Sequence, residues 1–261
     1  MLRAAWRLGL YLFFTLLCMP VQLVLFFIWP RGTRLFPVWY HRQCLKLFGI
    51  TVEVVGQPAA HHPCLYVSNH SSYLDIPVLG SLVPACFVAK REVAGWPLFG
   101  LLAKLQNTLF IDRRVSKVGQ GQAALLARLK AGDDLVLFPE GTSSDGLRVL
   151  PFRRALFQAV LDQAGELPLV IQPVSVFCSE VNGTVADRHA KQLYAWFGDM
   201  ELLPHLWQFC QLRSVKVRVI FGRPLSPGGF HSRHDLTRMA QAAVADGQPI
   251  GELIQFKLLK G

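Results

Sequence analysis

The stretch "CLYVSNHSSYLDIPVLGSL", residues 64 to 82, joins a short apolar run to a helical pattern through a polar turn. Residues 64–68 have the composition of a strand, and residues 74–82 have that of a helix. We expect the helix to begin near Tyr73, with one of the two serines before it as the N-cap. A strand followed by a turn and a helix is the repeating unit of α/β domains.

Strand-like and helical runs alternate along the rest of the chain. The further strand-like runs are residues 51–56, 86–90, 108–111, 134–139, 167–176 and 214–222. The further helical runs are residues 96–105, 117–131, 153–164 and 232–246. This order predicts an α/β fold with a largely parallel sheet flanked by helices. Basic and apolar side chains alternate in the last strand-like run, which predicts a half-exposed strand near an edge.

The amino-terminal segment predicts contact with a membrane. Residues 8–29 form 22 consecutive positions without a charge, which is about enough for a helix to cross the hydrocarbon core. The run ends in bulky residues rather than in a small-residue cleavage site, which argues against a signal peptide. Because Pro20 interrupts it, we expect a kinked helix that enters one leaflet, with a spanning helix as the alternative. Residues 34–49 predict an interfacial helix, or else an ordinary amphipathic core helix.

These patterns divide the chain into two parts. We expect residues 1–49 to form membrane-anchoring helices and residues 50–261 to form the α/β domain. Within that domain, residues 177–211 are the least regular stretch and predict an insertion.

Charge and cysteine usage narrow the class of protein. The net charge is +10, and the first fifty residues hold six Lys or Arg and no acid, which favours an anionic membrane surface. The basic residues flank apolar runs and form no dense basic tract, which argues against nucleic acid as the partner. The six cysteines include no C-x-x-C pair, so neither a disulfide framework nor a zinc site is expected. We therefore expect the inner membrane, with the catalytic domain on its cytoplasmic side.

His70 and Asp75 are the first candidates for chemistry. On one continuous helix their side chains would point about 140° apart. They meet only if His70 lies in the turn and Asp75 in the first helical turn. A carboxylate in that position orients an imidazole and stabilises its charge after it accepts a proton. The alternative is a capping aspartate beside a solvent-facing histidine.

Two further motifs follow strand-like runs. The stretch "LFIDRR", residues 109–114, ends in paired arginines, which bind phosphate or carboxylate or else lie in a solvated loop. The stretch "LVLFPEGTSSDG", residues 135–146, offers a glycine and several hydroxyls for an oxyanion or a polar head group, or else is an ordinary turn. Because parallel strands end at the same edge of a sheet, these motifs predict a shared site.

Four motifs together resemble those of a known family. "NHSSYLD" (69–75), "FIDRR" (110–114), "FPEGT" (138–142) and "IQPV" (171–174) are similar, in order and interval, to the four motifs of the glycerolipid acyltransferase family. That family includes the 1-acyl-glycerol-3-phosphate (lysophosphatidic acid) acyltransferases. The resemblance covers roughly residues 50–225.

The resemblance implies an enzyme that transfers an acyl chain to a hydroxyl. His70 would be the general base that deprotonates the acceptor, and Asp75 its partner. The acyl donor would be acyl-CoA or acyl-carrier protein, with no cofactor, no metal and no acyl-enzyme. The acceptor-binding residues that the resemblance implies are Lys104, Arg113, Glu140, Gly141 and Thr142.

The acceptor is expected to be a lysolipid. The first expectation is 1-acyl-glycerol-3-phosphate, which would yield phosphatidic acid. "YAWFGDMELLPHLW", residues 194–207, resembles a segment of a bacterial subgroup that includes lyso-ornithine lipid acyltransferases, so that acceptor is the close alternative. We assign the aromatic side chains of this segment to the core. A thioester hydrolase and a non-catalytic membrane-binding homologue are the less favoured alternatives.

Overall fold

The computed structural model describes residues 1–29, 32–112, 114–163 and 165–248. The described helices are α1 (Leu2–Ile28), α2 (Gly32–Phe48), α3 (Asp75–Gly80), α4 (Phe99–Leu105), α5 (Val118–Lys130), α6 (Ala155–Leu161), α7 (Arg188–Tyr194), α8 (Leu202–Gln211) and α9 (Arg233–Asp246). The described strands are β1 (Ile50–Val55), β2 (Cys64–Ser68), β3 (Cys86–Lys90), β4 (Leu109–Ile111), β5 (Leu135–Leu137), β6 (Val170–Val181), β7 (Thr184–Val185) and β8 (Val215–Phe221).

The strands form one sheet in the order β1-β8-β6-β2-β5-β3-β4, with β7 paired to β6. The five strands from β6 to β4 are mutually parallel, which confirms the predicted α/β fold with a largely parallel sheet. Strand β8 runs antiparallel to β6 and parallel to the edge strand β1. As predicted, β8 lies next to an edge and alternates buried with half-buried residues.

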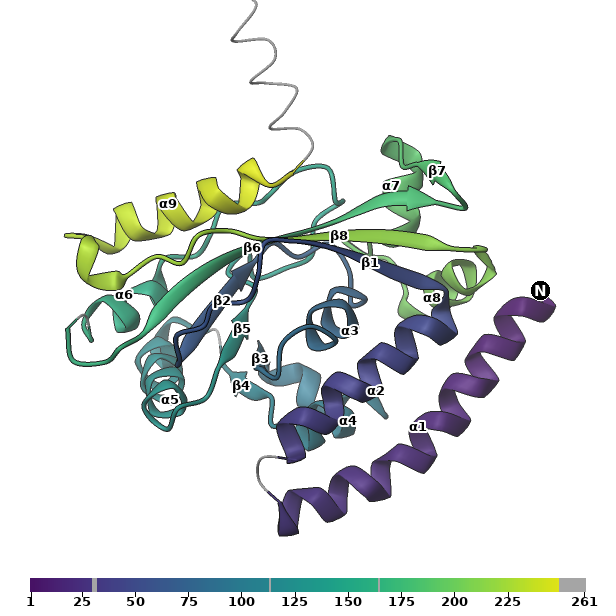
Figure 1. The fold of residues 1–261 in the computed structure, drawn as a ribbon, viewed down its shortest axis with the longest axis horizontal. Coiled ribbons are helices and arrows are strands. Elements are labelled where there is room, and N and C mark those ends of the chain that lie inside the picture. Colours follow the sequence, from purple (N-terminus) through teal and green to yellow (C-terminus); the bar gives the residue numbers. More distant parts are fainter. Residues whose placement is uncertain (30–31, 113, 164, 249–261) are drawn as a thin grey trace, which may run out of the picture.

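Helices cover both faces of the sheet (Figure 1). Consecutive residues of β2 enter different cores: Tyr66 packs with α2, α3 and α8 residues on one face, and Leu65 and Val67 pack with α5, α6 and α9 residues on the other. All five residues of β2 are buried. A central parallel strand is covered on both faces, which explains its continuous apolar sequence.

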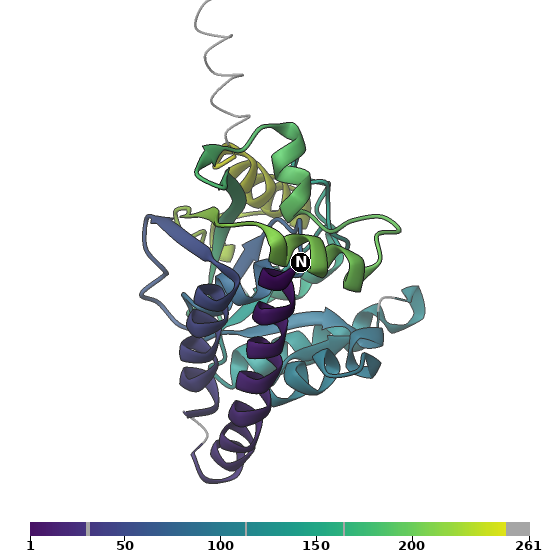
Figure 2. The same cartoon turned by 90° about the vertical axis from the view of Figure 1, so that its right-hand side faces the viewer.

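The two amino-terminal helices lie side by side, with α2 packed against the core of the sheet and α1 on the outer side of α2 (Figures 1 and 2). Helix α1 continues through Pro20, so the proline does not end it. Within the described ranges, α1 is the one helix long and apolar enough to cross a membrane. Its first half is attached to the rest of the protein, because Arg7 donates hydrogen bonds to the carbonyl oxygens of Leu212 (2.7 Å) and Arg213 (3.1 Å), just after α8.

The segment expected to be an insertion is more regular than its composition suggests. Strand β6 extends to Val181, and the chain then forms β7, α7 and α8. Helices α7 and α8 pack beside the core on the same face as α2 and α3. This placement brings residues 194–197 close to the turn after β2, as Trp196 N donates to the Ser71 carbonyl at 2.8 Å.

Candidate active site

The turn between β2 and α3 is organised by Asp75. Its Oδ2 accepts hydrogen bonds from the backbone N–H groups of Ser71 (2.8 Å) and Ser72 (2.9 Å). Helix α3 begins at Asp75, its N-cap is Leu74, and no side chain caps it. The residue in the N-cap position is therefore not a serine, although the Ser72 Oγ accepts a hydrogen bond from the backbone N–H of Leu74 at 3.3 Å, as expected of a serine at the start of a helix. The Asp75 carboxylate satisfies the backbone donors of Ser71 and Ser72 from inside the helix.

His70 and Asp75 form the pair that the spacing predicted. His70 lies before the helix and Asp75 in its first turn, with Nδ1 and Oδ2 3.0 Å apart. The Asp75 side chain is fully buried, whereas the imidazole is 20% exposed. An ionised carboxylate only accepts, so Nδ1 carries the proton and Nε2 keeps its lone pair. Among the described residues Nε2 has no hydrogen-bond partner, so it is available to accept a proton from outside the protein.

Two aromatic residues fix this pair. The His70 ring stacks on Phe138, with ring centroids 4.1 Å apart and an interplanar angle of 20°. The Tyr194 hydroxyl donates a 2.8 Å hydrogen bond to Asp75 Oδ1. The sequence interpretation placed Tyr194 in the core and gave it no role at the site. Its only sequence signal was its place in the segment 194–207, because 119 residues separate it from Asp75.

Asn69 attaches the turn to the neighbouring strand. Its amide accepts from Val176 N and donates to Val176 O, both at 2.8 Å, although Val176 lies in β6. These two side-chain hydrogen bonds take the place of backbone hydrogen bonds between β2 and β6 at the point where β2 ends. Sequence reasoning gave Asn69 no role either, since nothing local distinguishes it from any other turn asparagine.

The third motif lies against the same turn. The Glu140 side chain is buried, and its Oε1 accepts from the backbone N–H of His70 at 3.1 Å. Burial, with the charge of Asp75 adding to it, raises the pKa of the Glu140 carboxyl to about 8. Gly141 follows with a φ of 78°, which glycine adopts without strain. Thr142 is exposed. The structure therefore brings Glu140 together with His70 and Asp75, through the backbone of the turn.

The second motif is described only in part. Arg113 lies outside the described residues. Arg114 is bound to Asp112, which accepts from its Nε at 3.0 and 2.9 Å, and this guanidinium lowers the pKa of the Asp112 carboxyl to about 2. Lys104 is exposed near the end of α4, and no ion pair or hydrogen bond joins its amine to another described residue. The structure does not bring Lys104 into contact with the His70–Asp75 pair.

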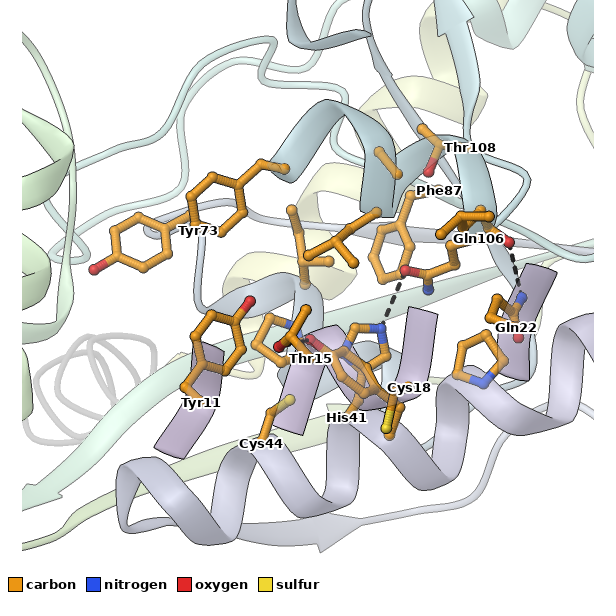
Figure 3. A pocket seen from close by; sticks show the side chains of 18 of the residues that line it. Tyr11, Thr15, Cys18, Gln22, His41, Cys44, Tyr73, Phe87, Gln106 and Thr108 are labelled. Atoms are coloured by element: carbon orange, nitrogen blue, oxygen red, sulfur yellow. Dashed lines mark hydrogen bonds between the residues drawn. The ribbon is translucent and has the colours of Figure 1, made fainter. Parts of the chain in front are cut away.

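An apolar pocket opens beside the turn between β2 and α3, with Tyr73 in its lining (Figure 3). Its cavity of about 200 Å³ lies among α1, α2, α3, α4, β3 and α8. Tyr73 and Leu74, which immediately precede Asp75, line it. Phe87 also lines the pocket. Its ring stacks on Phe138, and the His70 ring stacks on Phe138 as well. The pocket and the imidazole are therefore neighbours.

One face of α1 forms a long wall of this pocket. The lining residues Tyr11, Thr15, Cys18 and Gln22 are spaced as neighbours on one helix face, and they extend about 16 Å along the axis. Gln22 and Gln106 lie at the end away from Tyr73 (Figure 3). Apolar cavities of about 150 Å³ already bind small hydrocarbons, so this elongated pocket suits a hydrocarbon chain.

Comparisons with known proteins point to one enzyme family. Residues 51–177 match the model of a family described as Acyltransferase. The lyso-ornithine lipid O-acyltransferase of Brucella abortus is 40% identical over 215 residues, which cover 81% of this chain and 80% of that protein. The 1-acyl-sn-glycerol-3-phosphate acyltransferase of Neisseria meningitidis is 32% identical over 183 residues, which cover 69% of this chain and 68% of that protein.

A solved structure has the same fold. The 1-acyl-sn-glycerophosphate (LPA) acyltransferase PlsC from Thermotoga maritima superposes with a TM-score of 0.58 at 20% identity. The superposition covers 95% of this chain and 97% of that one. It therefore extends over the amino-terminal helices as well as the sheet.

Proposed function

Because this chain belongs to the acyltransferase family, we propose that it transfers an acyl chain from a thioester donor to the free hydroxyl of a lysolipid. The observation that carries the proposal is the His70–Asp75 pair in a turn whose residues Tyr73 and Leu74 line an apolar pocket. A base with a free lone pair, held beside a space for a hydrocarbon, is what acyl transfer to a lipid hydroxyl requires.

The reaction needs one proton carrier. His70 Nε2 takes the proton of the acceptor hydroxyl as the oxygen attacks the thioester carbonyl. The buried Asp75 carboxylate, 3.0 Å from Nδ1, stabilises the imidazolium that forms. The C–S bond then breaks, and the departing thiolate receives the proton from the imidazolium. The products are the ester and a free thiol, and His70 returns to its starting state.

The pocket beside the turn is the proposed site of the donor's acyl chain. Its lining is predominantly apolar, and the stripe from Tyr11 to Gln22 gives it length along α1. A chain lying there places its thioester near Tyr73 and Leu74, next to His70. The donor is acyl-CoA or acyl-carrier protein, which share the thioester.

For the acceptor, lyso-ornithine lipid becomes the stronger candidate. The Brucella abortus relative that carries this name is 40% identical, whereas the 1-acyl-sn-glycerol-3-phosphate acyltransferase of Neisseria meningitidis is 32% identical. The head group of ornithine lipid carries a carboxylate, which an arginine binds as well as it binds phosphate. We propose Arg113 and Lys104 as the cations that receive this anion. Gly141 and Thr142 contribute backbone and hydroxyl groups to acceptor binding. Glu140 supports acceptor binding indirectly, because it accepts a hydrogen bond from the backbone of His70 and so holds the turn in place.

The amino-terminal helices are the proposed membrane anchor. Outside the pocket, α1 exposes large apolar side chains such as Phe13 and Leu17, and α2 exposes Trp39. Since Arg7 attaches the start of α1 to the end of α8, we propose that α1 lies along the membrane surface and enters one leaflet. In this arrangement the site faces the cytoplasmic leaflet of the inner membrane, where a lysolipid already resides.

Parallel acceptor assays test the proposal. The purified protein receives a labelled acyl thioester with lyso-ornithine lipid, with 1-acyl-glycerol-3-phosphate, or with no acceptor. We expect labelled ester with the first acceptor at the highest kcat/KM. Free fatty acid alone in all three vessels would indicate a hydrolase, and no turnover in any vessel would indicate a non-catalytic membrane-binding protein. Either result would contradict the proposal.

A further inference from the structure

We infer that Tyr194 is a positioning residue for the catalytic pair, acting on His70 through Asp75. Its hydroxyl donates to Asp75 Oδ1 at 2.8 Å, and both side chains are almost completely buried. The inference rests on the roles proposed for His70 and Asp75 and extends them to α7, outside the four motifs.

The Asp75 carboxylate accepts four hydrogen bonds among the described residues, three at Oδ2 and one at Oδ1. Oδ2 accepts from the imidazole and from the N–H groups of Ser71 and Ser72, whereas Oδ1 accepts from the Tyr194 hydroxyl. Tyr194 is therefore the one donor to Oδ1 among the described residues. A buried carboxylate oxygen without a donor is strongly disfavoured, so the carboxylate would turn if the hydroxyl were absent.

Tyr194 is suited to a fixed donor role. Burial, with the nearby charge of Asp75, raises its pKa well above the usual range, so the hydroxyl keeps its proton at every pH at which an enzyme works. Its ring packs against Phe209 of α8, with centroids 6.4 Å apart. Two residues further on, Trp196 N donates to the Ser71 carbonyl at 2.8 Å. The end of α7 thus holds both the carboxylate and the turn that carries the imidazole.

The hydroxyl also keeps the charge of Asp75 directed at His70. A carboxylate that has turned away from Nδ1 attracts the imidazolium less strongly. Among the described residues, the other titratable side chains around the pair are Glu140 from the loop after β5, Tyr73 from the turn and Cys178 from β6. None of them changes chemically when the Tyr194 hydroxyl is removed, so a change in the pH profile reports on this hydroxyl.

The test compares Tyr194→Phe with Tyr66→Phe. Both changes delete one buried hydroxyl and keep the ring, but Tyr66 lies in β2 and packs on Phe221, away from the pair. For Tyr194→Phe we expect kcat to fall about 10- to 100-fold with KM for both substrates nearly unchanged. We also expect the acid limb of the pH profile of kcat to move to lower pH, because the turned carboxylate stabilises the imidazolium less. Tyr66→Phe should change neither quantity.

The outcomes separate this inference from the proposed function. If His70→Ala is inactive but Tyr194→Phe matches Tyr66→Phe in kcat and in pH profile, the positioning role is wrong and the proposed site stands. A Tyr194→Phe variant that loses kcat with an unmoved pH profile and a lowered unfolding temperature would also overturn the role, because it would indicate packing alone. If His70→Ala itself keeps its activity, the proposed site fails first.

Discussion

Replacing Asp75 by asparagine removes one charge from the catalytic pair and keeps the hydrogen bonds around it. Oδ2 accepts from His70 Nδ1, Ser71 N and Ser72 N. Because a backbone N–H cannot accept, the amide oxygen of asparagine must take the place of Oδ2. The amide NH₂ group then faces the Tyr194 hydroxyl, which turns to accept. We therefore expect a folded variant in which Nδ1 still carries its proton.

The lost charge sets the size of the effect. During the reaction the imidazolium lies against the carboxylate, with Nδ1 and Oδ2 3.0 Å apart. A hydrogen bond to a charged group contributes about 1.5 to 3 kcal/mol, and two unit charges about 4 Å apart interact by about 4 kcal/mol at an effective dielectric constant of about 20. For Asp75→Asn these values predict a fall in kcat of about 10- to 1000-fold. The acid limb of the pH profile should move to lower pH, because the imidazolium has lost its counter-ion.

The assay is the initial rate of thiol release from an acyl thioester with saturating acceptor, measured across about pH 5 to 9. The matched control is Asp134→Asn, because Asp134 pairs with His62 at 2.9 Å at the opposite end of β2. A kcat of Asp75→Asn within about threefold of the wild type would show that the charge is not used. An unfolding temperature far below that of the control would show that the amide does not replace the hydrogen bonds.

Three further changes test other parts of the account. The pKa of Glu140 is raised to about 8 from 4.5, so its contribution to stability is complete below about 4.5 and is lost as the pH rises through about 8. Glu140→Gln should therefore raise the unfolding temperature by at least about 5 °C at pH 9 and much less at pH 5; an equal shift at both pH values would contradict this burial effect. Cys18→Phe fills the middle of the pocket and should shift the kcat/KM preference to shorter acyl donors by about tenfold or more, whereas Leu17→Phe, on the exposed side of α1, should not; the same preference in both would refute the acyl site. Arg7→Ala removes three hydrogen bonds from α1 to the end of α8 and should speed proteolysis within α1, with Arg3→Ala, which loses one, having the smaller effect; equal rates would argue against this attachment.

The local parts of the site were predictable from the sequence. The position of His70 before a helix and Asp75 in its first turn agreed with helical geometry, because the two side chains would point about 140° apart on one continuous helix. The strand ends followed from short apolar runs, and β2 and β3 have the predicted bounds. At these positions the local pattern of apolar residues was sufficient to predict where the strands begin and end.

Long-range contacts were not predictable in the same way. Tyr194 reaches Asp75 across 119 residues, and Asn69 reaches Val176 across 107. Neither pair leaves a pattern in a single sequence, since each depends on how distant elements pack. The N-cap residue is Leu74 and not a serine, although Ser72 Oγ still accepts a hydrogen bond from Leu74 N. The antiparallel direction of β8 was likewise not encoded in its alternation, which is the same for either direction.

The central claim is that His70 Nε2 is the base for acyl transfer. The most direct measurement is the amount of labelled lipid ester that purified wild-type protein, His70→Ala and His62→Ala form from a labelled acyl thioester and a lysolipid acceptor. His62 pairs with Asp134 beside the start of β2, so its variant controls for the loss of an imidazole that is paired with a carboxylate. We predict a fall of about 10²- to 10⁴-fold for His70→Ala and a rate close to that of the wild type for His62→Ala. Near-normal ester formation by a folded His70→Ala variant would contradict the account.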